Sequence, residues 1–172
     1  MECKAATVEV DESIHLGLDT KAGCSSISKE CQHKECHNKV LSVVAIPSSE
    51  AHKVWAEAEE WVGLALSQFD TGYGSEDILT EIQLRNMQLW MVPGYAACVT
   101  SIQYRPKHKA AVVAFLGGKE MHLWFSDLMG VIEAWAKESG CKYLEEYGRG
   151  GWIKEGKKLG WEKFQTVMRK TL

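Results

Sequence analysis

Two glycine-containing stretches in the last third of the chain carry residue types that bind anions. Gly117 and Gly118 precede Lys119 and stand directly before a segment with helical periodicity. The free N–H groups and the dipole of a helix N-terminus form an anion site, to which a lysine adds charge. Arg149 lies in a second glycine-rich turn before Trp152, where its guanidinium could bind phosphate or carboxylate through two hydrogen bonds. Simple turn formation at the first stretch and core packing at the second are the alternatives.

A compact group of zinc-binding residue types lies near the N-terminus. It comprises Cys31, His33, Cys36 and His37, with Cys24 nearby. Structural zinc sites usually combine two separated ligand pairs, and this cluster has no distant partner pair. We therefore expect no metal site here. Residues 1–39 lack sustained apolar periodicity, and we interpret them as a polar extension to the domain. A zinc-dependent interaction module in this extension is the alternative.

Composition sets the outer limits of the interpretation. The chain has 172 residues, of which 45% are hydrophobic and 25% charged, which suits one domain with one core. A formal charge of -3 gives no overall attraction to nucleic acid or to an anionic membrane. No apolar run approaches the roughly 20 residues of a membrane span, and the acidic N-terminus does not resemble a secretory signal. We expect a reduced, cytosolic setting.

The anion-binding stretches belong to a predicted crossover unit. Residues 110–116 are small and β-branched, as in a strand buried on both faces. A helical stripe runs from Trp124 to Ala136 and ends at Gly140. Residues 141–147 follow as a strand, then a short helix to about Leu159, and residues 163–172 alternate well enough to predict a closing strand. Strand, helix and strand in this order form a parallel unit.

The preceding part of the globular domain, from residue 40, predicts two helices between strands. A short strand over residues 40–46 leads to a helix that Ser48 or Ser49 would cap, with an apolar stripe that reaches Phe69. Ser75 would cap a second helix that includes Met87. Three strands, at residues 88–92, 95–104 and 109–116, are separated by turns of two to four residues and predict an antiparallel meander.

This order of elements resembles the GCN5-related N-acetyltransferase (GNAT) superfamily over residues 40–172. The fold that the resemblance implies is α/β, an α+β sandwich whose mixed central sheet has an antiparallel meander leading into a parallel strand pair, with helices on both faces. Two local sequences look most like those of GNAT-like proteins encoded by bacteriophages: Leu-Gly-Gly at residues 116–118 and Gly-Arg-Gly-Gly-Trp at residues 148–152.

In GNAT proteins, acetyl-CoA lies where two parallel strands part, and its pyrophosphate contacts the turn that enters the central helix. The family turn reads Arg/Gln-x-x-Gly-x-Gly/Ala, and this sequence keeps glycines there without the full spacing. The resemblance implies cofactor binding by the corresponding stretch, Leu116, Gly117, Gly118, Lys119, Glu120 and Met121. Arg149, which aligns with a family asparagine, is a further candidate for cofactor binding.

This sequence matches the catalytic residues of the family less well than it matches the family's order of elements. A family tyrosine that protonates the departing thiolate aligns with Gly156, so the usual general acid is absent. Glu145 and Glu146 end the strand that would border the cleft, and strand alternation sends one to each face. We therefore predict Glu146 as the base and Tyr147 as the acid, with a solvated strand end as the alternative.

The resemblance implies transfer of an acetyl group from acetyl-CoA to an unidentified amine. The alternative is a catalytically inactive GNAT-fold phage protein that serves as a binding or structural, virion-associated module. The expected partners are acetyl-CoA, an amine and, in the phage case, a phage or host protein, with neither membrane nor nucleic acid among them. The expected location is the cytoplasm, which is the host cytoplasm for a phage protein, with the virion as the alternative.

Overall fold

The computed structural model describes residues 41–148 and 150–172, which belong to one compact unit, Asn38–Leu172. The predictions about the extension 1–39, its cysteines and histidines, and about Arg149 concern residues outside these ranges.

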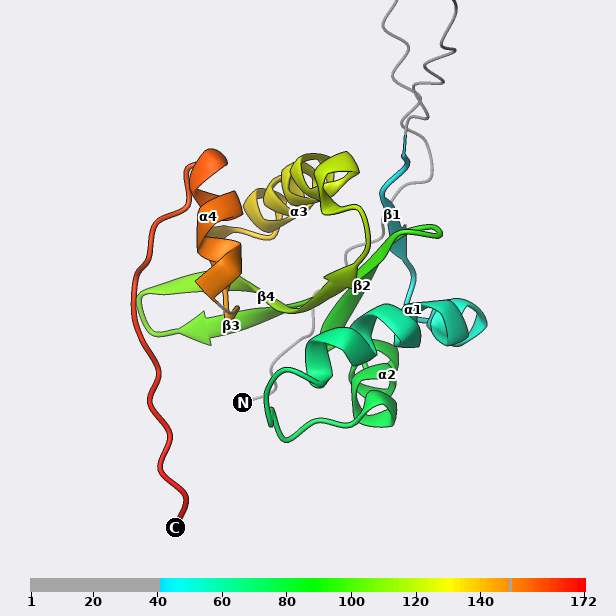
Figure 1. The fold of residues 1–172 in the computed structure, drawn as a ribbon, viewed down its shortest axis with the longest axis horizontal. Helices are drawn as coiled ribbons and strands as arrows, with labels where there is room; N and C mark the ends of the chain where they lie inside the picture. The colour runs from blue at the N-terminus through cyan, green and yellow to red at the C-terminus, as the bar shows by residue number, and fades with distance from the viewer. Residues whose placement is uncertain (1–40, 149) are drawn as a thin grey trace, which may run out of the picture. The chain divides into compact units, whose positions relative to one another are not determined.

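A mixed five-stranded sheet forms the centre of the unit (Figure 1). Its strands lie side by side in sequence order: β1 (Val44–Ile46), β2 (Met87–Val92), β3 (Ala96–Arg105), β4 (His108–Gly118) and β5 (Cys141–Glu146). The first three neighbouring pairs are antiparallel, and β4 pairs with β5 in parallel. The predicted meander and parallel crossover are therefore confirmed, and with them the fold class.

Helices cover both faces of the sheet, as Figure 1 shows. On one face lie α1 (Ala51–Leu66) and α2 (Ser75–Gln83), and on the other lie α3 (Phe125–Glu138) and α4 (Gly150–Lys158), with a 3₁₀ turn, η1 (Met121–Leu123), before α3. Each face has its own core, because a strand sends alternate side chains to opposite sides. Trp55 and Val62 of α1 pack on the first face, and Leu128 and Ile132 of α3 on the second. None of the described helices is long and apolar enough to cross a membrane.

Four predictions about the first helices are wrong in detail. The N-cap of α2 is Gly74, and Ser75, predicted as the cap, is the first residue of the helix. The residue that caps α1 is Glu50, so neither Ser48 nor Ser49 fills the expected position. Phe69 lies beyond the end of α1 and is 54% exposed, because the chain turns at Ser67 before the apolar stripe is complete. Met87 begins β2 and pairs with Ser101, so tertiary pairing prevails over the helical pattern.

The end of the chain also differs from the sequence prediction. Gly140 has φ of 73° and ends α3 as predicted. Residues 163–172, predicted as a closing strand, have no strand partner among the described residues, and β5 stays at the edge of the sheet. Alternation alone did not specify a pairing partner for this segment.

Candidate functional site

The candidate site lies where β4 and β5 separate. Their parallel ladder runs from Lys109 opposite Cys141 to Val113 opposite Glu146 and stops there. β4 continues to Gly118, and over this stretch it pairs with β3 alone. Residues 114–118 therefore present one backbone edge that no described strand covers.

A β-bulge stands at the point of separation. In the β3–β4 ladder Thr100 is opposite Val113 and Val99 is opposite Phe115, so Ala114 is an extra residue in β4. A bulge bends its strand and increases the local twist. The bulge thus gives a physical reason for β4 to leave β5 at this residue.

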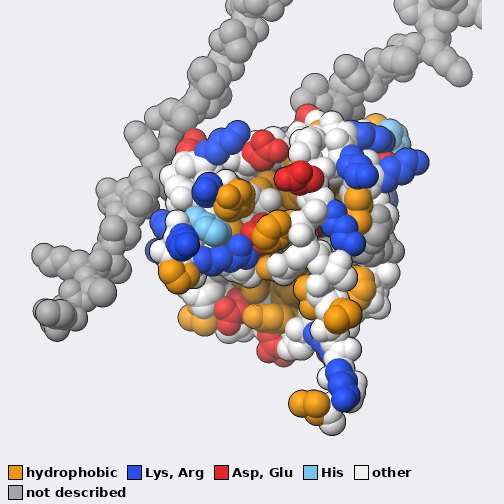
Figure 2. All heavy atoms as spheres, turned by 90° about the vertical axis from the view of Figure 1, so that its left-hand side faces the viewer, with side chains coloured by type: hydrophobic (Ala, Val, Ile, Leu, Met, Phe, Trp, Pro, Cys, Tyr) orange, Lys and Arg blue, Asp and Glu red, His pale blue; other side chains and the backbone are white. Residues whose placement is uncertain are grey.

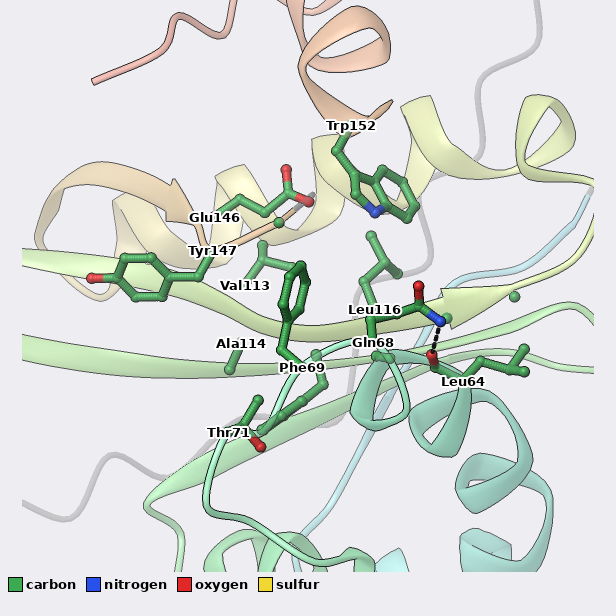
Figure 3. Close-up of a pocket in the computed structure, with 15 residues that line it drawn as sticks. Leu64, Gln68, Phe69, Thr71, Val113, Ala114, Leu116, Glu146, Tyr147 and Trp152 are labelled. Atoms are coloured by element: carbon green, nitrogen blue, oxygen red, sulfur yellow. Dashed lines mark hydrogen bonds between the residues drawn. The ribbon is translucent and has the colours of Figure 1, made fainter. Parts of the chain in front are cut away.

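A cavity of about 120 Å³ occupies the gap between the separated strands. Its walls come from the end of α1 and the following loop, from β4, from the end of β5 and from α4. Figure 3 shows Phe69 beside Val113, and Trp152 above Leu116. The lining residues are Leu64, Ala65, Gln68, Phe69, Thr71, residues 113–118, Glu146, Tyr147, Gly148 and Trp152.

Glu146 is the acidic residue in this lining. No hydrogen bond or ion pair within the described ranges involves its carboxyl group, and burial raises its pKa to about 7. The carboxyl group lies against Gly148, where a Cβ atom would be 2.6 Å from Glu146 Oε1 and 3.1 Å from Trp152 Cδ1. A carboxyl group with this pKa is present in both protonation states near neutral pH, so it can accept or donate a proton.

Glu145 has the opposite environment, although it is the next residue. Its two carboxylate oxygens accept hydrogen bonds from Arg105 Nη1 and Nη2, each at 2.6 Å. The bidentate pair lowers the pKa of Glu145 below its ordinary value. Strand alternation separates the two glutamates as predicted, and the structure places Glu146 at the cavity.

Tyr147 lines the cavity directly after β5, but the residue is 48% exposed. Figure 3 shows its hydroxyl group directed away from Glu146 and Trp152. The hydroxyl group instead interacts with Arg105, whose pKa it helps to raise after the larger effect of Glu145. In this conformation the Tyr147 hydroxyl does not face the Glu146 carboxyl group.

The glycines predicted as a turn lie inside β4. Gly117 pairs with Ala97 and Gly118 with Ala96. A Cβ atom on Gly117 would be 1.9 Å from the Trp61 carbonyl oxygen, and one on Gly118 would be 2.6 Å from the Tyr95 carbonyl oxygen. Both glycines are needed for close packing of α1 and β3 against β4, so the turn interpretation is wrong for these two residues.

The actual turn comprises Lys119 and Glu120, of which Glu120 has a left-handed φ of 51°. The Lys119 N–H group donates to Tyr95 O, and its ammonium group lies 5.7 Å from the Trp61 ring centroid. The buried Trp61 indole N–H group has no acceptor within the described part of the chain. The 3₁₀ turn η1 separates this loop from α3, so the loop does not lead directly into the α3 N-terminus.

The predicted site residues thus fall into three groups. Leu116, Gly117, Gly118, Glu146 and Tyr147 line one cavity. Lys119, Glu120 and Met121 follow it in the β4–α3 connection and do not line it. Arg149 lies outside the described residues.

Sequence reasoning missed the bulge at Ala114 and the contribution of the α1–α2 loop. The sequence carries no signal for Ala114, since alanine is ordinary in a buried strand. The helical stripe includes Phe69, but the structure places this residue beyond the end of α1, where it lines the cavity. No group of three His, Cys, Asp or Glu residues suited to a metal ion occurs in residues 41–148 and 150–172.

Comparison with known proteins identifies the fold. The sequence matches no protein-family profile and no curated protein. A solved probable acetyltransferase is similar with a TM-score of 0.58 and 9% identity, covering 77% of this chain and 97% of its own. The aminoglycoside acetyltransferase meta-AAC0020 from an uncultured soil metagenomic sample, solved with sisomicin, has a TM-score of 0.57 and 10% identity, covering 78% and 98%.

A further neighbour is aminoglycoside N-acetyltransferase AAC(6')-Iy, solved in complex with CoA. Its TM-score is 0.54 at 10% identity, and the match covers 77% of this chain and 94% of that one. Because these identities are low, the similarity shows the fold, which is that of the GNAT acetyltransferases. The predicted relationship to phage-encoded proteins stays a prediction.

Proposed function

We propose that this chain is a GNAT-type N-acyltransferase that moves an acetyl group from acetyl-CoA to an amine. The observation that carries the proposal is the separation of β4 from β5 over a cavity lined by the partly buried Glu146 carboxyl group. The similarity in fold to acetyltransferases, one of them solved with CoA, supports it.

The open edge of β4 suits an extended ligand that carries amide groups. Residues 114–118 keep a strand conformation, and the backbone groups on their β5 side lack a strand partner among the described residues. Such groups bind an extended amide chain as they would bind a further strand. When bound, acetyl-CoA would supply the acetyl thioester that an amine attacks.

Glu146 is proposed as the general base. An amine must lose a proton during attack, and a carboxylate with a pKa of about 7 accepts one near neutral pH. Phe69 and Trp152 line the same cavity, and burial of the carboxyl group there raises the pKa of Glu146. The proton passes to Glu146 either directly or through one water molecule.

The phosphate groups would be held differently from the family pattern. Gly117 and Gly118 lie within β4, so they form no phosphate-binding glycine turn of their own. The proposal assigns Lys119 as the phosphate-facing cation beyond the cavity, in the connection that includes Glu120 and Met121, and Arg149 as a second cation. Substitution of either residue is then expected to weaken binding of acetyl-CoA more than turnover of the bound complex.

The role of Tyr147 as the acid that protonates the thiolate stays a prediction. It requires the hydroxyl group to leave the neighbourhood of Arg105 and turn toward the cavity. Replacement by phenylalanine tests it, since loss of a catalytic proton donor lowers kcat by about 10²-fold or more.

A second candidate function is a binding or structural module without turnover, encoded by a phage. Two observations favour it: the β4–α3 connection offers no glycine-rich phosphate turn, and the Tyr147 hydroxyl group faces away from the cavity. Association with a virion or with a host protein belongs to this candidate alone.

Release of CoA thiol from acetyl-CoA in the presence of amines, with mass spectrometry of the products, separates the two candidates. The amines should include polyamines, a lysine peptide and an aminoglycoside. We expect turnover that falls by about 10²-fold to 10⁴-fold in Glu146→Gln. Binding of acetyl-CoA without turnover of any amine would support the module, and absence of binding would contradict the acyltransferase.

A further inference from the structure

Charge is distributed unevenly along the globular part of the chain. Residues 41–81, which include β1, α1 and most of α2, contain eight acidic residues and one basic residue. Residues 82–172 contain fourteen basic and eight acidic residues. The formal charge of -3, from which no overall attraction to nucleic acid is expected, therefore conceals an acidic region and a basic region.

Part of the basic region lies at the end of the β3–β4 hairpin. β2 pairs with β3 only as far as Ser101, whereas the β3–β4 ladder continues to Arg105 opposite His108. The end of the hairpin therefore extends beyond β2, and Figure 1 shows its turn at the left-hand side of the sheet. Figure 2 views that side, where Lys and Arg side chains gather among hydrophobic ones.

Three lysines at this end of the sheet keep their charge free. We use the name hairpin patch for six residues: Tyr104, Lys107, His108, Lys109, Lys142 and Tyr143. Its lysines form no ion pair within the described ranges. The neighbouring carboxylate of Glu145 is already paired with Arg105, so it does not neutralise them. No residue of the patch lines the cavity between β4 and β5.

Each tyrosine of the hairpin patch has a lysine ammonium group beside its ring. Tyr104 is 75% exposed, and Lys109 Nζ lies 5.2 Å from its ring centroid. Tyr143 is 47% exposed, and Lys142 Nζ lies 5.2 Å from its ring centroid. Each pair thus combines an accessible aromatic ring with a cation. Proteins that bind single-stranded nucleic acid use these two groups for the base and the phosphate of a nucleotide.

Contacts within the protein hold both rings in place. Tyr104 and Lys109 are directly opposite each other in the β3–β4 ladder, and the Lys109 ammonium group also donates to the Ser139 carbonyl oxygen at 3.4 Å. The His108 ring meets the Tyr143 ring edge-on, with 5.0 Å between the ring centroids. Side chains that are already ordered lose less conformational entropy when a ligand binds.

We propose that the hairpin patch binds single-stranded nucleic acid, with bases stacked on the two tyrosines and phosphates against the three lysines. Strand alternation places Tyr104 and Tyr143 on opposite faces of the sheet, and Lys107 lies in the turn. A single strand can bend over the turn and reach both rings. A duplex keeps its bases stacked on one another, and an acidic peptide has no bases, so either would use the lysines alone.

Fluorescence anisotropy of a labelled oligothymidylate of about 20 nucleotides, titrated with the full chain at several salt concentrations, tests the proposal. We expect the single strand to bind more tightly than a duplex of the same length. Tyr104→Leu removes the ring but keeps an apolar strand residue, and it should weaken single-strand binding by about 5-fold to 150-fold. Tyr104→Phe keeps the ring and should retain the native affinity.

The salt dependence of the same titrations distinguishes phosphate contacts from stacking. Each phosphate contact contributes about 0.7 to the slope of log K against log salt for a single strand. Lys107→Ala and Lys142→Ala should each reduce the slope by about this amount, whereas Tyr104→Leu, and Lys53→Ala on α1 as the matched control, should leave it unchanged. Absence of binding at low salt, equal binding of duplex and single strand, full affinity in Tyr104→Leu, or an equal change in Lys53→Ala would overturn the proposal.

Discussion

The two faces of the last residues of β5 differ in almost every respect that matters for binding. On one face Glu145, opposite Val112 in the β4–β5 ladder, is held by Arg105 through two hydrogen bonds. On the other face Glu146, at the last pair of the ladder, lines a cavity without a described ion-pair partner. The pKa of Glu145 is lowered and that of Glu146 is raised to about 7, although the two residues are adjacent.

This difference shows how one local irregularity can create a site on a regular sheet. The extra residue, Ala114, lets β4 bend away while β3 continues to hold it. Backbone groups that would have joined the ladder become available to a ligand, and Glu146 at the end of β5 is partly buried beside them. The end of one strand can thus be structural on one face and available for chemistry on the other.

The largest expected effect is on the rate of acyl transfer when Glu146 is changed to glutamine. If Glu146 is the base, kcat/KM of the native protein should rise with pH through about 7 as the carboxyl group loses its proton. Glu146→Gln should lower the rate by about 10²-fold or more and remove this pH dependence. Glu145→Gln, on the opposite face of β5, should change the rate far less; equal losses in both variants would contradict the comparison.

Glu146 should also make stability depend on pH. Its folded pKa is raised, so the stabilisation is present below the unfolded value of 4.5 and is lost as pH rises through about 7. Glu146→Gln should therefore gain stability relative to the native protein over this range, by up to about 3 kcal/mol. Urea unfolding of both proteins at several pH values measures this difference. If the free energies of unfolding of the two proteins change with pH in parallel, the pKa of Glu146 is not raised.

The close approach of α1 to the open end of β4 predicts a further effect on stability. Gly117→Ala would place a Cβ atom 1.9 Å from the Trp61 carbonyl oxygen, and a backbone atom cannot simply rotate away. We expect a loss of about 1–3 kcal/mol in the free energy of unfolding. Gly63→Ala is the control, since its Cβ atom meets nothing within 4 Å and alanine favours the helix by about 0.5–1 kcal/mol. Thermal unfolding of the two variants should shift in opposite directions.

Gly148→Ala should disturb the Glu146 carboxyl group with little loss of stability. The added Cβ atom would meet Glu146 Oε1 at 2.6 Å, and a terminal carboxyl group can rotate away from it. We expect the rate to fall by about tenfold, the equivalent of about 1.4 kcal/mol. Gly151→Ala, whose Cβ atom meets nothing within 4 Å, should retain the native rate. The same rate in both variants would show that the position of the carboxyl group is unimportant.

The smallest effect is expected on the Glu145 face of β5. Arg105→Gln removes both hydrogen bonds to Glu145, whose lowered pKa stabilises the fold above its ordinary value of 4.5. The midpoint temperature should fall slightly at neutral pH, and the difference from the native protein should shrink as pH falls below 4.5. A difference that stays constant through acid pH would mean that the pair contributes nothing to stability.

The sequence predicted the fold because its strongest signals are local. The apolar stripe of α3, the glycine at position 140 and the short turns between strands each specify one element without reference to the rest of the chain. The cleft depends on register, which pairs residues far apart in sequence. No feature of the sequence around Ala114 indicates that it is the extra residue in the β3–β4 ladder, beside the point where the β4–β5 ladder ends.

The candidate site was predictable to a similar degree. Strand alternation predicted that Glu145 and Glu146 face opposite sides, and the order of elements placed them at the end of β5. Gly117 and Gly118 were expected in a turn, because a glycine pair gives the same pattern whether it permits a turn or a close backbone approach. The approaching groups, the carbonyl oxygens of Trp61 and Tyr95, become visible only in the folded protein.

The most direct test of the account is the response of β4 backbone amides to acetyl-CoA, followed by ¹⁵N chemical shifts in the full chain. If the open edge binds acetyl-CoA, the amides of residues 114–118 and the neighbouring end of β5 should shift, while those at the start of β4 and β5 should stay unchanged. Shifts confined to the start of the two strands, or none at saturating acetyl-CoA, would contradict the central claim that the separated strands form the acetyl-CoA site.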